Sequence, residues 1–340
     1  MTVWESPESP AAWEPIRPPR LIATDLDGTL LREDGSVSER TRRALSRLAD
    51  AGVDLVFVTA RPPRWVDHLG DVVGGHGTVI CANGAFVYDV ARRTVVRAHG
   101  IPPATARAIA ADLRQALPGV GFAAELADGV RLEREYPQLH PEDVPADGAY
   151  CAIDAIDQPV GKLLARSLLM AEAGFFREVA SIVGGRAQVT YSGSGGLAEI
   201  GPVGVTKGSA LVDWCSARAI AASDVWAFGD MPNDLPMLAW AGTSFAVANA
   251  HPDVRAAASY VCPSNDDDGV ASVVESLIAS LRRIGGHQPA GAGSPADRAR
   301  PAPVNPSSSV TSRMTPSQAG GSAGLSSPPS ISATREPSPN

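Results

Sequence analysis

Two aspartates stand two residues apart near the start of the chain, directly after a short apolar run. Leu21–Thr24 has the composition of a buried strand, and Asp25 and Asp27 follow it, before Gly28 and Thr29. Residues i and i+2 of an extended segment point the same way, so the two carboxylates can share one site. Carboxylates held that close repel each other unless a cation or a shared proton compensates. The pair therefore indicates a bound divalent metal, one raised pKa, or both.

Asp and Gly are also common in turns, so the first cluster could simply be a strand that ends in a turn. A second acidic cluster helps to decide between the two interpretations. Val225–Phe228 is another apolar run, and it leads directly into Gly229-Asp230-Met231-Pro232-Asn233-Asp234. The two clusters could be unrelated surface loops. Each follows an apolar strand, however, and open α/β sheets bind ligands at the carboxyl ends of their strands. The repetition favours one joint site.

The segments after the first cluster predict a parallel sheet. Ser38–Ala51 has the pattern of a capped helix, and Val53–Val58 is a β-branched apolar run. Strand, helix and strand at this spacing make a parallel β-α-β unit. Thr59 then falls at the same sheet edge as Asp25, where prolines begin the next helix. Its hydroxyl fits either an anion site at a helix N-terminus or an ordinary N-cap.

The sequence pattern changes in the middle of the chain, where it predicts short strands and helices that suit an α+β insert. We predict four regions: a flexible N-terminal segment 1–19, a core of 20–85 and 193–286, an insert of 86–192, and a disordered tail of 287–340. The tail is mostly Ser, Pro, Ala and Gly, which cannot bury enough surface to order. The core is expected to resume near Leu197, and Thr206 opens a helix. Lys207-Gly208-Ser209 is not a P-loop, because that motif requires lysine after glycine.

Composition narrows the function classes. The chain has 340 residues, 44% hydrophobic and 19% charged, with a net charge of −8. That balance argues against a nucleic-acid binder but permits an anionic small substrate, which a metal and local basic groups can hold. The four cysteines include no C-x-x-C pair, so neither zinc nor disulfides are indicated. With no apolar run near the roughly 18 residues of a membrane helix and no signal-peptide core, we expect a cytoplasmic protein without membrane contact.

Four motifs, in this order, resemble those of the haloacid dehalogenase superfamily: Asp25-Leu26-Asp27-Gly28-Thr29, Thr59, Lys207, and Gly229-Asp230 through Asn233-Asp234. The large insert between the second and third motifs is similar to the class IIB cap of the Cof-type sugar-phosphate phosphatases. Ala82-Asn83-Gly84-Ala85 and the run 265–271 also resemble that subgroup, whereas Ala60 stands where it often has glycine. The resemblance covers about 20–284 and implies a Rossmann-like parallel core with an inserted α+β cap.

The resemblance also implies a role for each acidic residue. Asp25 would be the nucleophile that accepts the phosphoryl group, and Asp27 the acid that protonates the leaving oxygen and later activates water. Mg²⁺ would lie between the carboxylates of Asp25 and Asp230 and the backbone carbonyl of Asp27, with Asp234 supporting it through water. A hard cation with oxygen ligands and an open face for phosphate is consistent with magnesium.

The phosphate and substrate would be held by a second set of residues. The resemblance assigns the phosphoryl oxygens to Thr59 and Lys207, with Asn233 orienting either the lysine or the phosphate. It adds Arg61, Asn83 and Gly84 as phosphate or substrate contacts. The function implied is a magnesium-dependent phosphatase acting on a small phosphorylated metabolite, above all a sugar phosphate.

Two alternatives stay open at this stage. A phosphomutase would need extra basic residues in the insert, where Arg131 and Arg134 are candidates but equally ordinary surface charges. A non-catalytic binding protein on the same scaffold would not need both Asp25 and Asp27. The identity of the substrate and the oligomeric state are not encoded in any motif.

Overall fold

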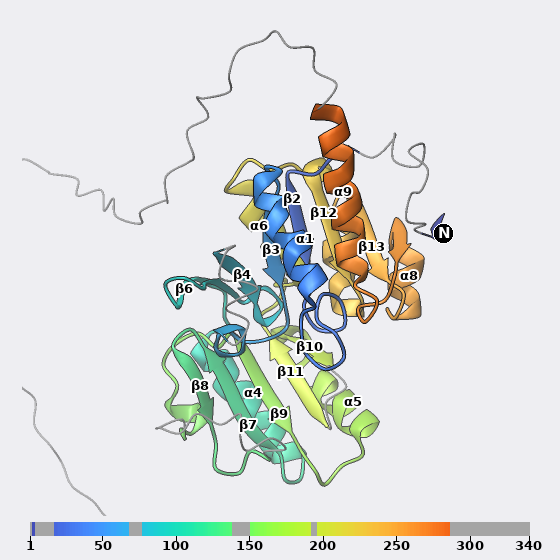
Figure 1. Cartoon of the computed structure of the whole chain (residues 1–340). Helices are drawn as coiled ribbons and strands as arrows, with labels where there is room; N and C mark the ends of the chain where they lie inside the picture. The colour runs from blue at the N-terminus through green and yellow to red at the C-terminus, as the bar shows by residue number, and fades with distance from the viewer. Residues whose placement is uncertain (1, 4–16, 68–76, 138–149, 192–195, 286–340) are drawn as a thin grey trace, which may run out of the picture. The chain divides into compact units, whose positions relative to one another are not determined.

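Two β-sheets organise the residues that the computed structural model describes, which are 2–3, 17–67, 77–137, 150–191 and 196–285 (Figure 1). The larger sheet has nine strands in the order β1-β14-β13-β12-β2-β3-β4-β5-β6. Neighbouring strands from β1 to β4 pair in parallel, whereas β5 pairs antiparallel with both β4 and β6. The bounds are β1 Thr2–Val3, β2 Leu21–Thr24, β3 Asp54–Val58, β4 Thr78–Cys81, β5 Phe86–Asp89, β6 Thr94–Ala98, β12 Val225–Gly229, β13 Thr243–Val247 and β14 Tyr260–Cys262.

The central strands of this sheet are apolar on both faces, as a parallel sheet covered by helices requires. Every residue of β2 and of β12 is buried. Helices α1 and α9 lie side by side across the sheet in Figure 1, and α6 and α7 pack against each other. The predicted α/β, Rossmann-like core is confirmed. The helices are α1 Glu39–Asp50, α2 Pro63–Val66, α4 Pro103–Ala116, α5 Glu172–Val183, α6 Lys207–Ser216, α7 Leu235–Trp240, α8 Pro252–Ala257 and α9 Gly269–Gly285.

The smaller sheet is antiparallel, in the order β10-β11-β9-β7-β8. Alternation along its strands separates two faces. Phe122, Ala124 and Leu126 of β7 belong to an apolar core that includes residues of α4 and α5, whereas Ala123 and Glu125 point the other way. The strands are β7 Gly121–Leu126, β8 Gly129–Leu132, β9 Lys162–Arg166, β10 Gln188–Tyr191 and β11 Leu197–Gly201. One-turn 3-10 helices are η4 Ala82–Gly84, η6 Ile153–Ala155, η7 Gly184–Arg186, η8 Ala222–Asp224 and η9 Pro232–Asp234.

Three strands belong to a different sheet from the one that the sequence led us to expect. Strands β5 and β6 fall within the predicted insert of 86–192, yet they extend the nine-stranded sheet, because β4 turns directly into β5 through η4. Strand β11, where we expected the core to resume near Leu197, instead pairs with β10 and β9 in the smaller sheet. The domain boundaries themselves stay a prediction.

Only a small part of the two predicted flexible regions lies among the described residues. Thr2–Val3 forms an edge strand parallel to β14, so this part of the segment 1–19 is regular structure. Residues 4–16 of that segment and the tail predicted for 287–340 lie outside the described residues. Within the described part of the chain, no helix is both long enough and apolar enough to cross a membrane.

Candidate active site

The two predicted acidic clusters meet at one edge of the nine-stranded sheet. Strands β2 and β12 are neighbours in parallel register, and the backbone N–H of Asp25 donates to the carbonyl of Phe228 at 3.1 Å. Asp230 follows β12, and Asp234 lies in the 3-10 turn η9. Asp25, Asp230 and Asp234 are buried and each offers one carboxylate oxygen, all within 4.8 Å of one another.

A fully buried lysine joins two of these carboxylates. Lys207 begins α6, whose N-terminus is closed by a reciprocal Thr206–Ser209 cap. Its Nζ donates to Asp234 Oδ1 at 2.7 Å and lies 2.8 Å from Asp25 Oδ1. Burial alone would lower the pKa of Lys207, but the carboxylates of Asp234 and Asp25 outweigh it and raise that pKa. The ammonium therefore stays charged in the site.

Burial acts in the opposite sense on the carboxyl groups. It raises the pKa of Asp25 well above its usual range, and the charges of Asp234 and Asp230 add to the rise while Lys207 opposes it. Burial likewise raises the pKa of Asp230 to about 6, against a hydrogen bond from Thr29 Oγ1 at 2.8 Å. Three buried carboxylates face one ammonium, so the cluster has negative charge left to compensate.

The loop after β2 approaches the cluster at a glycine. Gly28 has φ +74°, and a Cβ placed there would lie 2.4 Å from Asp230 Oδ2. Asp234 Oδ2 accepts the backbone N–H groups of Asp230 and Met231, both at 3.0 Å. Oxygen-only donors, fixed orientation and excess negative charge fit a hard divalent cation such as Mg²⁺. The carboxylates that would hold it are Asp25, Asp230 and Asp234.

Asp27 has a different environment from its neighbour. Its carboxylate lies outside this cluster and forms a two-point ion pair with Arg61, Nε to Oδ2 at 2.8 Å and Nη2 to Oδ1 at 2.5 Å. Its side chain is 54% exposed, against 6% for Asp25. The structure thus shows Arg61, a predicted phosphate or substrate contact, orienting Asp27.

The residues that follow β3 and β4 also lie at the sheet edge that carries Asp25. Thr59 is fully buried, and its Oγ1 accepts the backbone N–H of Arg61 at 3.0 Å. Asn83 has positive φ, and its Oδ1 accepts from Asn233 Nδ2 at 3.1 Å. Gly84 packs against α6: a Cβ there would lie 2.6 Å from the Thr206 carbonyl oxygen. This contact supports the start of the helix that carries the buried lysine.

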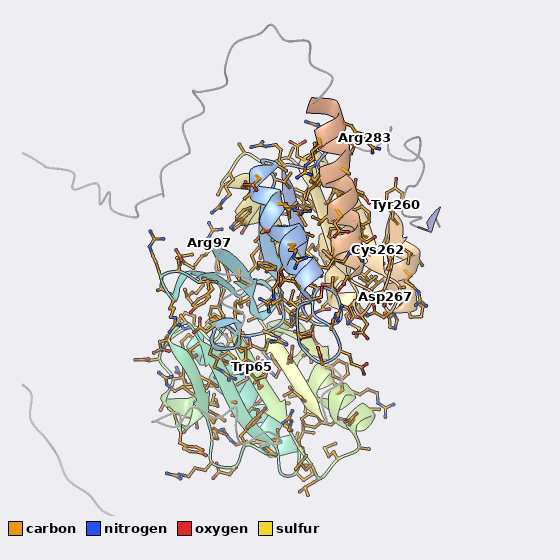
Figure 2. All side chains as sticks on the ribbon, in the orientation of Figure 1. Trp65, Arg97, Tyr260, Cys262, Asp267 and Arg283 are labelled. Atoms are coloured by element: carbon orange, nitrogen blue, oxygen red, sulfur yellow. The ribbon has the colours of Figure 1, made fainter. Side chains whose placement is uncertain are left out.

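A cavity of about 1290 Å³ opens over the cluster. The five-stranded sheet contributes Glu125, Lys162 and Glu199 to its wall, and Trp65, labelled in Figure 2, contributes an aromatic ring. The cavity brings together these predicted site residues: Asp25, Asp27, Arg61, Asn83, Lys207 and Asn233.

A model of the haloacid dehalogenase-like hydrolase family matches residues 22–274, about three quarters of the chain. The chain belongs to this family. The hydrolase is 28% identical over 271 residues to pyridoxal phosphate phosphatase YbhA from Escherichia coli K12, an alignment that covers 76% of this chain and 98% of the relative. It is also 28% identical over 240 residues to HMP-PP phosphatase from Escherichia coli 55989, which covers 70% and 87%.

Solved structures share the fold of this hydrolase. A haloacid dehalogenase-like hydrolase from Bacteroides thetaiotaomicron superposes with a TM-score of 0.64 at 24% identity, covering 76% of this chain and 99% of that one. TM0651 from Thermotoga maritima gives the same TM-score and identity over 75% and 96%.

Two asparagines help to position the site: Asn249, which no motif marks, and Asn265, which begins the run 265–271. Asn249 Nδ2 donates to the Gly28 carbonyl at 2.7 Å, and its Oδ1 accepts the backbone N–H of Asn265 at 3.1 Å. Asn265 Nδ2 in turn donates to the carbonyl of Leu31 at 2.9 Å. Both ends of the loop that follows Asp27 are held in this way.

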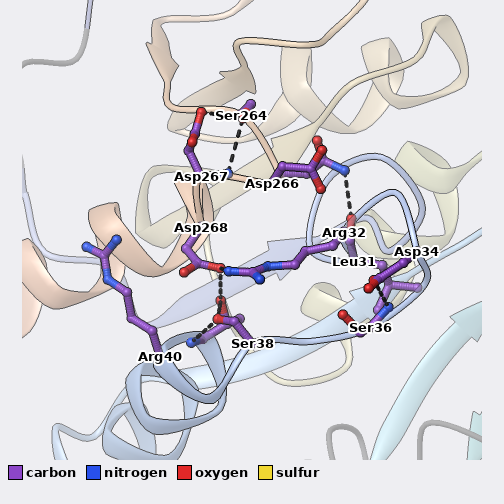
Figure 3. A network of polar contacts seen from close by, with 12 residues as sticks. Leu31, Arg32, Asp34, Ser36, Ser38, Arg40, Ser264, Asp266, Asp267 and Asp268 are labelled. Carbon is purple, nitrogen blue, oxygen red and sulfur yellow. Dashed lines mark hydrogen bonds and ion pairs between the residues drawn. The ribbon is translucent and has the colours of Figure 1, made fainter.

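An ion pair and a hydrogen bond extend this support farther from the cluster (Figure 3). Arg32 donates to Asp268 Oδ1 at 3.0 Å, and the backbone N–H of Glu33 donates to Asp266 Oδ1 at 3.0 Å. The loop between β2 and α1 is thereby fastened to the acidic segment before α9. Polar residues that interrupt the apolar pattern of predicted strands, such as Glu125 and Lys162, were the available signal for the cavity wall.

Proposed function

We propose that this hydrolase is a magnesium-dependent phosphatase that releases inorganic phosphate from a small phosphorylated metabolite. The observation that carries the proposal is the buried constellation of Asp25, Asp230 and Asp234 around Lys207. It offers a nucleophile, a cation site and a fixed positive charge at one sheet edge. The relatives named as phosphatases of pyridoxal phosphate and HMP-PP support the same reaction class.

In this proposal Asp25 attacks the phosphorus atom. A bond forms between one of its carboxylate oxygens and phosphorus while the bond from phosphorus to the leaving oxygen breaks, and Asp27 in its protonated form gives that oxygen a proton. Water then attacks the phosphoryl group on Asp25, the bond between the Asp25 oxygen and phosphorus breaks, and the deprotonated Asp27 takes a proton from the water. Phosphate leaves and both carboxyl groups return to their starting forms.

The remaining residues stabilise charge during transfer. Lys207 places its ammonium beside Asp25, where the phosphoryl oxygens would arrive, and Thr59 and Asn233 would complete the contacts. Magnesium, which Asp25, Asp27, Asp230 and Asp234 would hold, would supply electrostatic stabilisation of the transferring group. Arg61 acts in this account through Asp27, which it holds by two hydrogen bonds.

The substrate class we propose is a sugar phosphate, bound beneath the five-stranded sheet acting as a cap. The phosphomutase alternative gains no support from its two candidate arginines. Arg131 is paired with Asp128 at 2.9 Å, and the guanidinium of Arg134 lies over the ring of Tyr150. A cytoplasmic location remains a proposal from the sequence.

The test is phosphate release from a panel of phosphorylated metabolites, with magnesium and with chelator, for wild type and Asp25→Asn. Release that requires both magnesium and Asp25 supports the proposal. Release that is unaffected by chelator or by the substitution would contradict it.

A further inference from the structure

The face of the five-stranded sheet that lines the cavity carries a row of charges across three strands. Glu125 of β7 is the register partner of Lys162 of β9, and Glu199 lies on the next strand, β11. All three side chains are nearly buried. Charges removed from water to this degree need partners, so the pairing of each one is informative.

Glu125 is fully paired. Arg64 donates to its Oε1 at 2.8 Å and to its Oε2 at 3.4 Å, so both carboxylate oxygens are engaged. This pair also links the smaller sheet to α2, which begins shortly after Thr59.

Lys162 and Glu199 retain unused hydrogen-bonding capacity. Lys162 is 5% exposed, and its Nζ donates to the carbonyl of Ala60 at 3.0 Å and to Glu199 Oε2 at 2.9 Å. An ammonium group has three N–H donors, so one has no acceptor among the described residues. Within that same part of the chain, no donor reaches the second carboxylate oxygen of Glu199. A free donor and a free acceptor therefore lie side by side in the cavity wall.

A hydroxyl group matches this pair, because it accepts one hydrogen bond and donates another. We propose that Lys162 and Glu199 are specificity-determining residues that bind a hydroxyl of the substrate, on the part of the molecule that leaves with the ester oxygen. The inference rests on the proposed phosphatase function and adds the two residues that recognise a hydroxyl of the proposed sugar phosphate. The bond from Lys162 to Ala60, next to Thr59, fixes the position of this pair relative to the reacting centre.

The experiment compares aldose phosphates with cyclohexylmethyl phosphate, which has a six-membered ring without hydroxyl groups. The measured quantity is the ratio of kcat/KM for the best aldose phosphate to kcat/KM for the cyclohexylmethyl ester. We expect wild type to favour the aldose phosphate, and Glu199→Gln or Lys162→Met to lower the ratio about 10- to 100-fold, as for loss of a hydrogen bond to a buried charge.

Two further variants serve as controls for this experiment. Lys162→Met combined with Glu199→Gln leaves no lone buried charge, so it keeps the test valid if a single variant fails to fold. Glu125→Gln alters a charge of the same wall whose oxygens are already paired, and it should leave the ratio within about threefold of wild type, since no free hydrogen-bonding group is lost.

The outcomes separate the two proposals. Wild type that hydrolyses the cyclohexylmethyl ester as well as any aldose phosphate, or variants with an unchanged ratio, would overturn the role of Lys162 and Glu199 while leaving a phosphatase. Failure of wild type to hydrolyse either kind of ester would contradict the proposed function itself.

Discussion

Arg61 holds Asp27 through two parallel hydrogen bonds, while Asp25, two residues earlier, is buried against Lys207. One strand end thus delivers two carboxylates to two different environments. Such a difference suits distinct roles, one group as nucleophile and the other as acid and base.

Replacing Arg61 should affect turnover more than folding. Arg61→Ala removes the partner that orients Asp27, and we expect kcat to fall about 10- to 100-fold, a part of the roughly 10²- to 10⁴-fold that general acid–base catalysis contributes. Because Asp27 is 54% exposed, the free energy of unfolding should change by about 1 kcal/mol or less. Steady-state kinetics and thermal unfolding measure the two effects. A full loss of stability with kcat retained in the folded fraction would contradict this role.

Asp27 and Asp230 should respond differently to the same substitution. Asp27→Asn removes the proton donor but leaves the cluster of Asp25, Asp230 and Asp234 intact, so magnesium should still raise the Tm while turnover is lost. Asp230→Asn removes a carboxylate of that cluster and should abolish the magnesium-dependent rise. Thermal unfolding with magnesium and with chelator distinguishes them. An unaltered magnesium response in Asp230→Asn would mean that the cation site is wrongly placed.

Substitutions at Gly28 and Gly35 test whether the loop after β2 must approach Asp230 closely. Both have positive φ, +74° and +77°, so alanine at either costs about 1–2 kcal/mol of backbone strain. Only at Gly28 would the added Cβ collide with Asp230, whereas nothing lies within 4 Å at Gly35. We expect Gly28→Ala to lose magnesium-dependent phosphate release, and Gly35→Ala to keep it and to lose less stability. Equal activities of the two folded variants would refute the close approach.

Stability without metal should fall as pH rises. The raised pKa values of Asp25 and Asp230 mean that the folded protein holds these protons more tightly than the unfolded chain does. Their contribution to stability is therefore present at low pH and lost as pH rises through the folded pKa, about 6 for Asp230. Magnesium competes with those protons, so its stabilising effect should be larger near pH 8 than near pH 5. Equal shifts of Tm by magnesium at both values would contradict this linkage.

Much of the site could be predicted because the sequence pattern indicates where buried strands end. The apolar runs before Asp25 and Asp230 place both at the carboxyl edge of a parallel sheet, and neighbouring strands then bring them together. The place of Lys207 in the site came from the family resemblance, since the local pattern indicates only that a helix begins there.

The rest depends on pairing between distant segments. The residue patterns of β5, β6 and β11 indicate strands but not the sheet that each one joins, and the sheets they join differ from the expectation. The partners of Lys162 are Ala60 and Glu199, which lie 102 and 37 residues away. The two-point pair of Arg61 with Asp27 likewise depends on side-chain geometry that residue types alone do not specify.

The central claim is that Asp25 becomes phosphorylated, and chemical trapping tests it most directly. Rapid mixing with a turned-over phosphate ester, followed by acid quenching and borohydride reduction, converts an aspartyl phosphate to homoserine, which peptide mass spectrometry locates. We predict homoserine at position 25 in wild type and none in Asp25→Asn. Turnover without any modification at position 25, or homoserine at another aspartate, would contradict the account.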